Sequence, residues 1–318
     1  MLDPVQWLLV TLVLSILLLV FYNWMRTVPR YNGNEDLSGK TCVVTGANAG
    51  IGFTTALEFA KRNARVILAC RNKERAEEAR DKIIQKTGNS NVVFQELDLT
   101  RIKSVRKFVE RIIQEEERLD ILVNNAGVIG LPNKTTEDGL EPNFATNHFG
   151  PFLLTNLLLE LLKKSAPARV INVSSTVQSF GKIEFDNLRA EKSFSAGRIY
   201  FNSKLANVLF TRELAKRLKG TGVVAVCLHP GSVQTDLLAN MPFFIQIPMR
   251  LFRIFLRTQE EGAQTTLYCA LASEVKDMSG KYFAECELAE DKVNPLANDP
   301  DICQKLWELS SQYTGLQE

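Results

Sequence analysis

Tyr200 and Lys204 are two residues whose types and spacing suggest chemistry. They stand four residues apart in a stretch, 197–218, whose pattern predicts a helix. Residues at this spacing leave the same face of a helix, so the ammonium can lie beside the phenol. A free tyrosine has a pKa of about 10, and a nearby positive charge stabilises the phenolate and lowers that pKa. The pair is a candidate acid/base catalyst, although such pairs are more commonly a solvated helix edge.

A glycine-rich segment gives a second chemical signal. It reads Thr45-Gly-Ala-Asn-Ala-Gly-Ile-Gly52 and lies between an apolar run at 41–45 and a predicted helix at 51–62. Glycines permit a tight turn and let backbone N–H groups approach a pyrophosphate, whose charge suits a helix N-terminus. The spacing Gly-x3-Gly-x-Gly differs from the common fingerprint, but its position favours nucleotide binding over a plain turn. The candidate cofactor-binding residues in it are Gly46, Asn48, Gly50, Ile51 and Gly52.

The second predicted strand, 65–69, is followed by Cys70 and Arg71. An NAD site usually has a carboxylate here to hold the ribose 2'-hydroxyl, whereas an arginine accommodates the 2'-phosphate of NADP. No acidic residue follows before Glu74. We therefore expect NADP(H), with Arg71 on the 2'-phosphate, over a solvated charge that merely opens the next helix.

Small and polar residues also follow the remaining predicted strands. Asp98 comes after strand 92–97, where it either caps the next helix or accepts a hydrogen bond from the adenine amino group. Parallel strands bring their carboxyl ends to one edge of the sheet, where such folds bind ligands. The other segments at this edge are Asn124-Asn125-Ala126-Gly127, Ser174-Ser175 and His229-Pro-Gly-Ser-Val-Gln-Thr235.

The elements that would position these residues alternate between apolar strands and amphipathic helices. Strands that are apolar throughout and are separated by helices imply a parallel sheet covered on both faces. We predict an α/β fold, a doubly wound parallel sheet in a single Rossmann domain over residues 39–318, and 45% hydrophobic composition is ample for its core. The predicted strands are 41–45, 65–69, 92–97, 121–123, 169–173 and 223–228, and the predicted helices are 51–62, 72–86, 104–116, 143–164 and 197–218.

Composition argues against several classes of function. A net charge of +2 without a basic block gives a nucleic-acid partner no electrostatic footprint. The two histidines are far apart and lack clustered partners, so we expect no metal site. The six cysteines are scattered without a Cys-x-x-Cys pair, which indicates a reducing compartment.

Residues 1–25 are expected to form a membrane anchor, followed by a polar linker at 26–38. Residues 4–25 carry no charge and have aromatic side chains at both ends, and a bilayer-spanning helix needs about 20 apolar residues. Arg26 and Arg30 follow, so the charge bias places the body of the protein in the cytosol. The segment is too long and lacks the basic start and cleavage site of a signal peptide. Monotopic insertion stays open beside a spanning helix.

Over residues 38–285 the chain resembles the short-chain dehydrogenase/reductase family, and within it the membrane-anchored retinol dehydrogenases that prefer NADP(H). The resemblance implies an enzyme in the membrane of the endoplasmic reticulum with its catalytic domain facing the cytosol. The motifs that carry it are Thr45-Gly46-x3-Gly50-Ile51-Gly52, Leu68-Ala-Cys-Arg71, Asn124-Asn125-Ala126-Gly127, Asn147, Ser175, Tyr200-x3-Lys204, Ser203-Lys-Leu-Ala-Asn207 and His229-Pro-Gly231.

The resemblance also assigns roles to residues. Tyr200 would protonate the substrate oxygen that Ser175 holds. Lys204 would lower the pKa of Tyr200 and bind the nicotinamide ribose, and Asn147 would hold a water that relays protons toward Lys204. The implied reaction interconverts an aldehyde and a primary alcohol, retinal and retinol, in the reductive direction. The further cofactor-binding residues would be Asn125, Ala126, Gly127, Pro230, Gly231, Val233 and Thr235.

An apolar segment at about 236–258 is expected to be a substrate lid. Arg250, Arg253 and Arg257 recur in it at helical spacing, as in a basic interfacial helix, or as in a lid helix packed on the core. A steroid or a lipid-derived aldehyde is an alternative substrate, and a non-catalytic NADP-binding sensor or scaffold is an alternative of another class. The partners expected are a small apolar substrate and membrane lipid; a homo-oligomer stays open, as does the role of residues 286–318.

Overall fold

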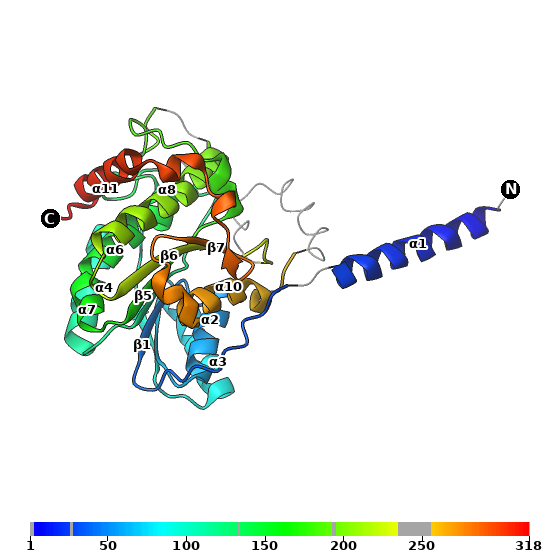
Figure 1. Ribbon diagram of the computed structural model, residues 1–318, viewed down its shortest axis with the longest axis horizontal. Helices are drawn as coiled ribbons and strands as arrows, with labels where there is room; N and C mark the ends of the chain where they lie inside the picture. Colours follow the sequence, from blue (N-terminus) through cyan, green and yellow to red (C-terminus); the bar gives the residue numbers. More distant parts are fainter. Residues whose placement is uncertain (1–2, 26–27, 133, 193–194, 235–255, 318) are drawn as a thin grey trace.

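The computed structural model describes residues 3–25, 28–132, 134–192, 195–234 and 256–317. An eight-stranded sheet forms its centre, in the order β3-β2-β1-β4-β5-β6-β7-β8 (Figure 1). Neighbouring strands are parallel except β7 and β8. The predicted doubly wound parallel sheet is confirmed. The strands are β1 (Thr41–Thr45), β2 (Arg65–Cys70), β3 (Val92–Glu96), β4 (Ile121–Asn124), β5 (Ala168–Val173), β6 (Val223–His229), β7 (Tyr282–Ala284) and β8 (Glu287–Leu288).

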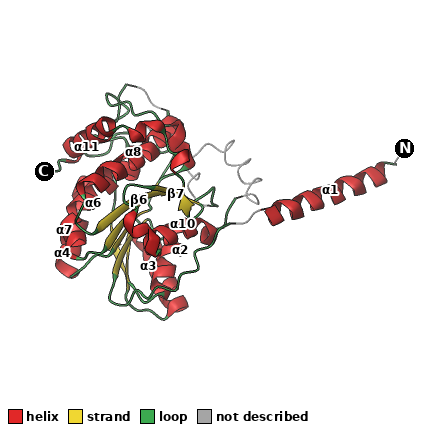
Figure 2. Cartoon of the chain, viewed as in Figure 1, coloured by secondary structure: helices red, strands yellow, loops and turns green. Residues whose placement is uncertain are grey.

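Helices cover both faces of this sheet (Figure 2). All residues of β1 are buried, because alternate side chains enter different cores. Cys42 and Val44 pack with α2, α3 and α10, whereas Val43 packs with α4, α6 and α8. The helices are α2 (Gly50–Lys61), α3 (Lys73–Thr87), α4 (Ile102–Glu115), α6 (Gly150–Leu157), α7 (Leu159–Lys164), α8 (Ala196–Arg217) and α10 (Gln259–Leu271).

The helix predicted at 143–164 is interrupted. It begins with α5 (Pro142–Phe144) and a π-helical turn, η1 (Ala145–Phe149), before α6 and α7. Pro151 has no N–H to donate to the carbonyl of Asn147, and in a regular α-helix its ring would collide with that carbonyl. The wider turn accommodates the proline, and the first residue of α6 bonds to a carbonyl five residues back. Asn147 therefore lies in a π turn, a feature often found at functional sites.

The C-terminal segment completes the core on the α6 and α8 side. Helix α11 (Pro300–Thr314) places Trp307 against two rings, 5.0 Å from Phe152 on α6 and 5.8 Å from Phe210 on α8. The edge strands β7 and β8 were not expected, because runs of three and two residues are too short to show a strand pattern. Residues 286–318, whose role the sequence left open, thus contribute to the core through α11.

The N-terminal segment contains helix α1 (Pro4–Met25), which extends away from the domain (Figure 1). Among the residues that the structure describes, no helix has the length and apolar character needed to cross a membrane. The described part of the expected linker, 28–38, packs onto the domain, where Leu37 is buried and the Tyr31 ring meets the Tyr268 ring.

Candidate active site

A cleft of about 400 Å³ opens at the carboxyl ends of the strands. Its walls come from the carboxyl ends of β1 to β6 and the segments after them, from η1, from α8 and from the first residue of α10, as expected for a doubly wound sheet. Most of the predicted cofactor residues line it. They are Gly46, Asn48, Gly50, Ile51, Arg71, Asp98, Asn125, Ala126, Gly127, Tyr200, Lys204 and Pro230.

The glycine loop after β1 fits the pyrophosphate of a dinucleotide. Gly46 has a φ of +66°, which a residue with a side chain rarely adopts. A Cβ at Gly52 would lie 2.5 Å from both the Asn125 side-chain nitrogen and the Gly46 carbonyl oxygen. No side chain caps the N-terminus of α2, so its N–H groups can serve a phosphate. The loop therefore allows the close backbone approach that the sequence predicts, while Gly52 lies behind the wall and supports it.

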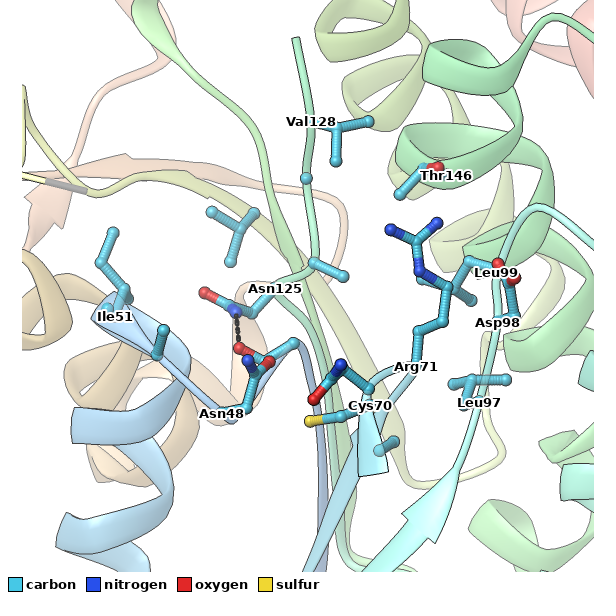
Figure 3. Close-up of a pocket in the computed structure, with 18 of the residues that line it drawn as sticks. Asn48, Ile51, Cys70, Arg71, Leu97, Asp98, Leu99, Asn125, Val128 and Thr146 are labelled. Atoms are coloured by element: carbon cyan, nitrogen blue, oxygen red, sulfur yellow. Dashed lines mark hydrogen bonds between the residues drawn. The ribbon is translucent and has the colours of Figure 1, made fainter. Parts of the chain in front are cut away.

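Cys70 and Arg71 stand at the end of β2, where the sequence predicts the choice of cofactor. The Cys70 thiol lies under the glycine loop and accepts hydrogen bonds from the backbone N–H groups of Ala47 and Asn48. Burial raises the pKa of this thiol to about 11, so it is neutral at physiological pH. The Arg71 side chain extends across the cleft toward Thr146 (Figure 3). This edge thus combines a guanidinium with a neutral residue in place of a carboxylate.

The sequence pattern did not point to Arg75. Arg75 lies in the first turn of α3 and lines the same cleft, so a second basic residue shortly after Arg71 is the signal that could have found it. Asp98 also lines the cleft, and its Oδ1 accepts hydrogen bonds from the N–H and the hydroxyl of Thr100 at 3.0 and 2.7 Å. Asp98 therefore orders its own turn and remains placed for an adenine contact.

Tyr200, Ser175 and Lys204 come together beside the cleft. The Tyr200 side chain is 7% exposed, and its hydroxyl is hydrogen-bonded to the Ser175 side chain. The Lys204 ammonium lies 5.7 Å from the centre of the Tyr200 ring and donates to the Val173 carbonyl at 3.0 Å. A Cβ at Gly127 would lie 3.2 Å from Lys204 Nζ, so the glycine leaves room for the ammonium.

Burial sets the pKa of both groups. It raises the pKa of Tyr200 to about 12, and the hydrogen bond with Ser175 offsets part of this effect. It lowers the pKa of Lys204 to about 8. The prediction that the ammonium lowers the pKa of the phenol was wrong, because the ammonium is directed to the Val173 carbonyl and does not offset the lost hydration. At neutral pH the site holds a protonated phenol beside a largely protonated amine.

The two adjacent serines occupy different environments. Ser174 is buried, and its hydroxyl donates to the backbone carbonyl of Lys204 at 2.7 Å. Ser175 is only partly buried and directs its hydroxyl to Tyr200. Of the two serines, Ser175 is thus the one directed to Tyr200, whereas Ser174 is the one among the residues that line the cleft.

Asn147 stands next to the Gly127 segment. Its Oδ1 accepts from the Val128 N–H at 2.8 Å, and its Nδ2 donates to the Val128 carbonyl at 2.9 Å and to Ser203 Oγ at 3.0 Å. The side chain thus ties the post-β4 segment to α8.

The segment after β6 lies only partly in the cleft wall. Pro230 lines the cleft, whereas Gly231 and Val233 lie behind it: a Cβ at Gly231 would collide with the Arg257 side chain, and Val233 forms a β-bridge with Arg257. Arg257 also pairs with Glu285. The prediction that Arg257 belongs to a basic helix was therefore wrong, because this arginine is fixed to the domain. Thr235, Arg250, Arg253 and most of the expected lid lie outside the described residues.

A dinucleotide cleft that meets a hydrogen-bonded tyrosine is the arrangement of a nicotinamide-dependent oxidoreductase, in which a proton donor stands where hydride is exchanged. Comparison with known proteins agrees with this class. The family model for short chain dehydrogenases matches residues 40–242. The chain belongs to this family.

Its relatives share most of its length. Retinol dehydrogenase 12 of Homo sapiens is 49% identical over 283 residues, which cover 89% of each chain. Retinol dehydrogenase 11 of Mus musculus is 47% identical over 283 residues, again 89% of each chain. A crystal structure of an uncharacterised protein from Mycobacterium paratuberculosis has a TM-score of 0.71 and 32% identity, and the match covers 88% of this chain and 95% of that one.

Proposed function

We propose that this enzyme is an NADP(H)-dependent oxidoreductase that interconverts a membrane-soluble aldehyde and its primary alcohol, with retinal and retinol as the pair and reduction as the physiological direction. The observation that carries the proposal is the Tyr200–Ser175 hydrogen bond beside Lys204 at a cleft suited to a dinucleotide. A phenol with a pKa of about 12 is protonated in the cell, which suits a proton donor to a reduced carbonyl.

Bound NADPH supplies a hydride to the aldehyde carbon. The residues of the chain handle the oxygen. Ser175 donates a hydrogen bond to it, and Tyr200 transfers its phenolic proton to it as negative charge develops. Lys204 would bind the nicotinamide ribose, and a water held at Asn147 would return a proton to Tyr200. We assign these four residues as catalytic.

The cofactor preference follows from the end of β2. A 2'-phosphate there would meet the Arg71 guanidinium, with Arg75 on the same cleft wall and Cys70 instead of a carboxylate at the end of β2. The ribose hydroxyls of NAD would find the neutral Cys70 thiol instead of an acceptor carboxylate. This arrangement favours NADP(H) over NAD(H).

The substrate class follows from apolar surface next to the reactive groups. Phe201 follows Tyr200, and Phe180 ends the 3-10 turn η2 (Thr176–Phe180) that begins directly after Ser175. The two rings lie 6.3 Å apart, and Phe180 is 73% exposed. Such a surface suits a long apolar chain. The names of the relatives at 45–49% identity make retinal the first substrate to test.

Steady-state kinetics of the full chain in detergent tests this function. Retinal, a medium-chain aldehyde and a ketosteroid are each assayed with NADPH and with NADH. We expect the highest kcat/KM for retinal with NADPH. A higher kcat/KM for the ketosteroid or the medium-chain aldehyde would make that compound the substrate in place of retinal. Binding of NADPH without turnover of any carbonyl would favour a sensor over an enzyme.

We also propose that α1 attaches the enzyme to a membrane, that of the endoplasmic reticulum, with the domain in the cytosol. In support, large apolar residues of α1, from Val5 to Phe21, are between 37% and 70% exposed, a surface that lipid would cover. Co-flotation with vesicles, compared between the full chain and a chain lacking residues 1–25, tests attachment. Protease protection separates a spanning helix from a monotopic one, and microscopy with an organelle marker tests the location.

A further inference from the structure

Residues 28–37, here called the strap, join α1 to the domain and lie along its surface. The Tyr31 N–H donates to the side-chain oxygen of Gln264 on α10 at 2.9 Å. The Tyr31 ring packs edge-on against Tyr268, with centroids 6.1 Å apart. Toward β1, Leu37 is 7% exposed, and its N–H donates to the Arg62 carbonyl at 2.7 Å. The strap is thus held along its length by α10 and by the end of α2.

Hydrogen bonds hold the middle of the strap in a compact loop. The Tyr31 hydroxyl donates to the Glu35 carboxylate across Gly33, and the Arg62 guanidinium donates to the Gly33 carbonyl at 3.0 Å. A Cβ at Gly33 would collide with both the phenol and the carboxylate. An added methyl group at Gly33 would therefore displace the ends of these two side chains and disturb their hydrogen bond.

The strap begins close to the wall of the cleft. The Pro29 carbonyl lies 3.9 Å from Cys286 Sγ, and the residue before that cysteine, Glu285, pairs with Arg257. The Arg257 N–H donates at 2.8 Å to the carbonyl of Ser232, in the segment that continues the cleft wall after β6. Direct contacts thus connect the start of the strap to the cofactor site.

Little chain separates this point from α1. Pro29 follows Met25 by four positions, and an extended chain spans at most about 3.6 Å per residue, hence about 14 Å. Beside Cys286, Leu288 on β8 is 50% exposed. Figure 1 shows α1 leaving the molecule on the side of β7 and α10, away from α4 and α11. A lipid surface that holds α1 must therefore lie near this side of the domain.

We propose that the strap fixes the domain relative to α1 so that the β7–β8 edge and the cleft wall after β6 face a phospholipid bilayer. A lipophilic aldehyde then passes between the bilayer and the cleft without crossing bulk water. The inference rests on the proposed attachment through α1 and on the proposed substrate class.

Energy transfer from bound NADPH to a fluorescent headgroup lipid in phosphatidylcholine vesicles measures the distance from cleft to lipid without any turnover. The variants are an eight-residue Gly-Ser insertion between Val28 and Pro29, and Gly33→Ala. The matched control carries the same eight residues after Glu318. We expect the insertion to reduce transfer at least twofold, Gly33→Ala to reduce it less, and the control to match the native chain.

The same proteins are then assayed with retinal in vesicles and in detergent micelles. The insertion is expected to lower kcat/KM roughly tenfold in vesicles and less than twofold in micelles, because a flexible tether no longer holds the cleft at the lipid. Unchanged energy transfer in the inserted chain would overturn the coupling, and so would equal losses in vesicles and micelles. Failure of the native chain to float with vesicles would overturn attachment and coupling together, whereas absent turnover in micelles would overturn only the proposed reaction.

Discussion

In the proposed reaction, the Tyr200 hydroxyl gives a proton to the substrate oxygen that Ser175 holds. Tyr200→Phe keeps the buried ring and removes that proton. We expect kcat for aldehyde reduction to fall by roughly 10²- to 10⁴-fold, the usual contribution of a positioned general acid, while the Kd for NADPH changes less than about twofold. Tyr313→Phe on α11 is the control for losing a phenol elsewhere. Substantial reductase activity in the Tyr200 variant would contradict the assignment.

The Lys204 ammonium gives cofactor binding a pH dependence. Burial lowers its pKa to about 8, so its positive charge is present below pH 8 and is lost as the pH rises through that value. We expect the Kd for NADPH to rise between pH 7 and pH 9, as measured by fluorescence titration. Lys204→Arg keeps the charge at every pH in this range and should remove the inflection near pH 8. An equal inflection in the arginine variant would assign it to another group.

Arg71 is the residue on which we expect cofactor preference to depend most. Arg71→Asp replaces the guanidinium with a carboxylate that repels a 2'-phosphate and accepts from ribose hydroxyls. The ratio of kcat/KM for NADPH to that for NADH should fall at least about tenfold, the value of one hydrogen bond to a charged group. Lys73→Asp makes the same charge change two residues away, outside the cleft-lining set, and should leave the ratio nearly unchanged. An equal fall of the ratio in both variants would mean that the net charge of the region, and not a contact of Arg71, sets the cofactor preference.

At the scale of elements, the turn from β1 into α2 depends on the absence of a side chain at Gly52. An added Cβ would lie 2.5 Å from the Gly46 carbonyl oxygen. Because this oxygen belongs to the backbone, the clash can be relieved only if the glycine loop moves. Gly52→Ala should therefore weaken NADPH binding by at least about tenfold, since small displacements of a positioned site are costly. Gly197→Ala adds the same methyl group to α8 where no atom lies within 4 Å, and should leave the Kd unchanged. Equal affinities in the two variants would show that the loop tolerates the methyl group.

The elements could be predicted from sequence where the pattern is long and local. Helix 197–218 and the six central strands follow from their apolar periodicity, and the strand ends follow from the topology. The π turn around Asn147 was not anticipated, because the effect of Pro151 depends on a carbonyl four residues back. Arg257 matched a helical spacing but belongs to a β-bridge, since its pairing with Glu285 is set by contacts across the fold. The direction of the Tyr200 pKa shift likewise needed burial, which spacing alone does not give.

At the scale of the whole molecule, His148 joins the segments that close the core behind the site. It is fully buried in η1, its ring lies among phenylalanines of α5, α6 and α8, and its Nε2 is 2.9 Å from Ser310 Oγ on α11. Burial lowers its pKa to about 3. The folded protein therefore keeps this imidazole neutral at pH values where the unfolded chain, with a histidine pKa of about 6.5, takes up a proton. Stability must fall as the pH drops below about 6.5, by about 1.4 kcal/mol per pH unit from this one group.

His148→Phe removes the titrating group and leaves a ring of similar shape, and the Ser310 hydroxyl keeps its bond to the Leu306 carbonyl at 2.7 Å. Urea unfolding of both proteins in detergent, at pH 7.5 and pH 5, isolates the effect, because all other titrating groups are shared. Between pH 7.5 and pH 5, the free energy of unfolding of the native chain should fall by about 2 kcal/mol more than that of the variant. This difference does not depend on which protein is more stable at pH 7.5. Parallel pH curves would mean that His148 is protonated within the fold, and that the contact between η1 and α11 is made by a cation.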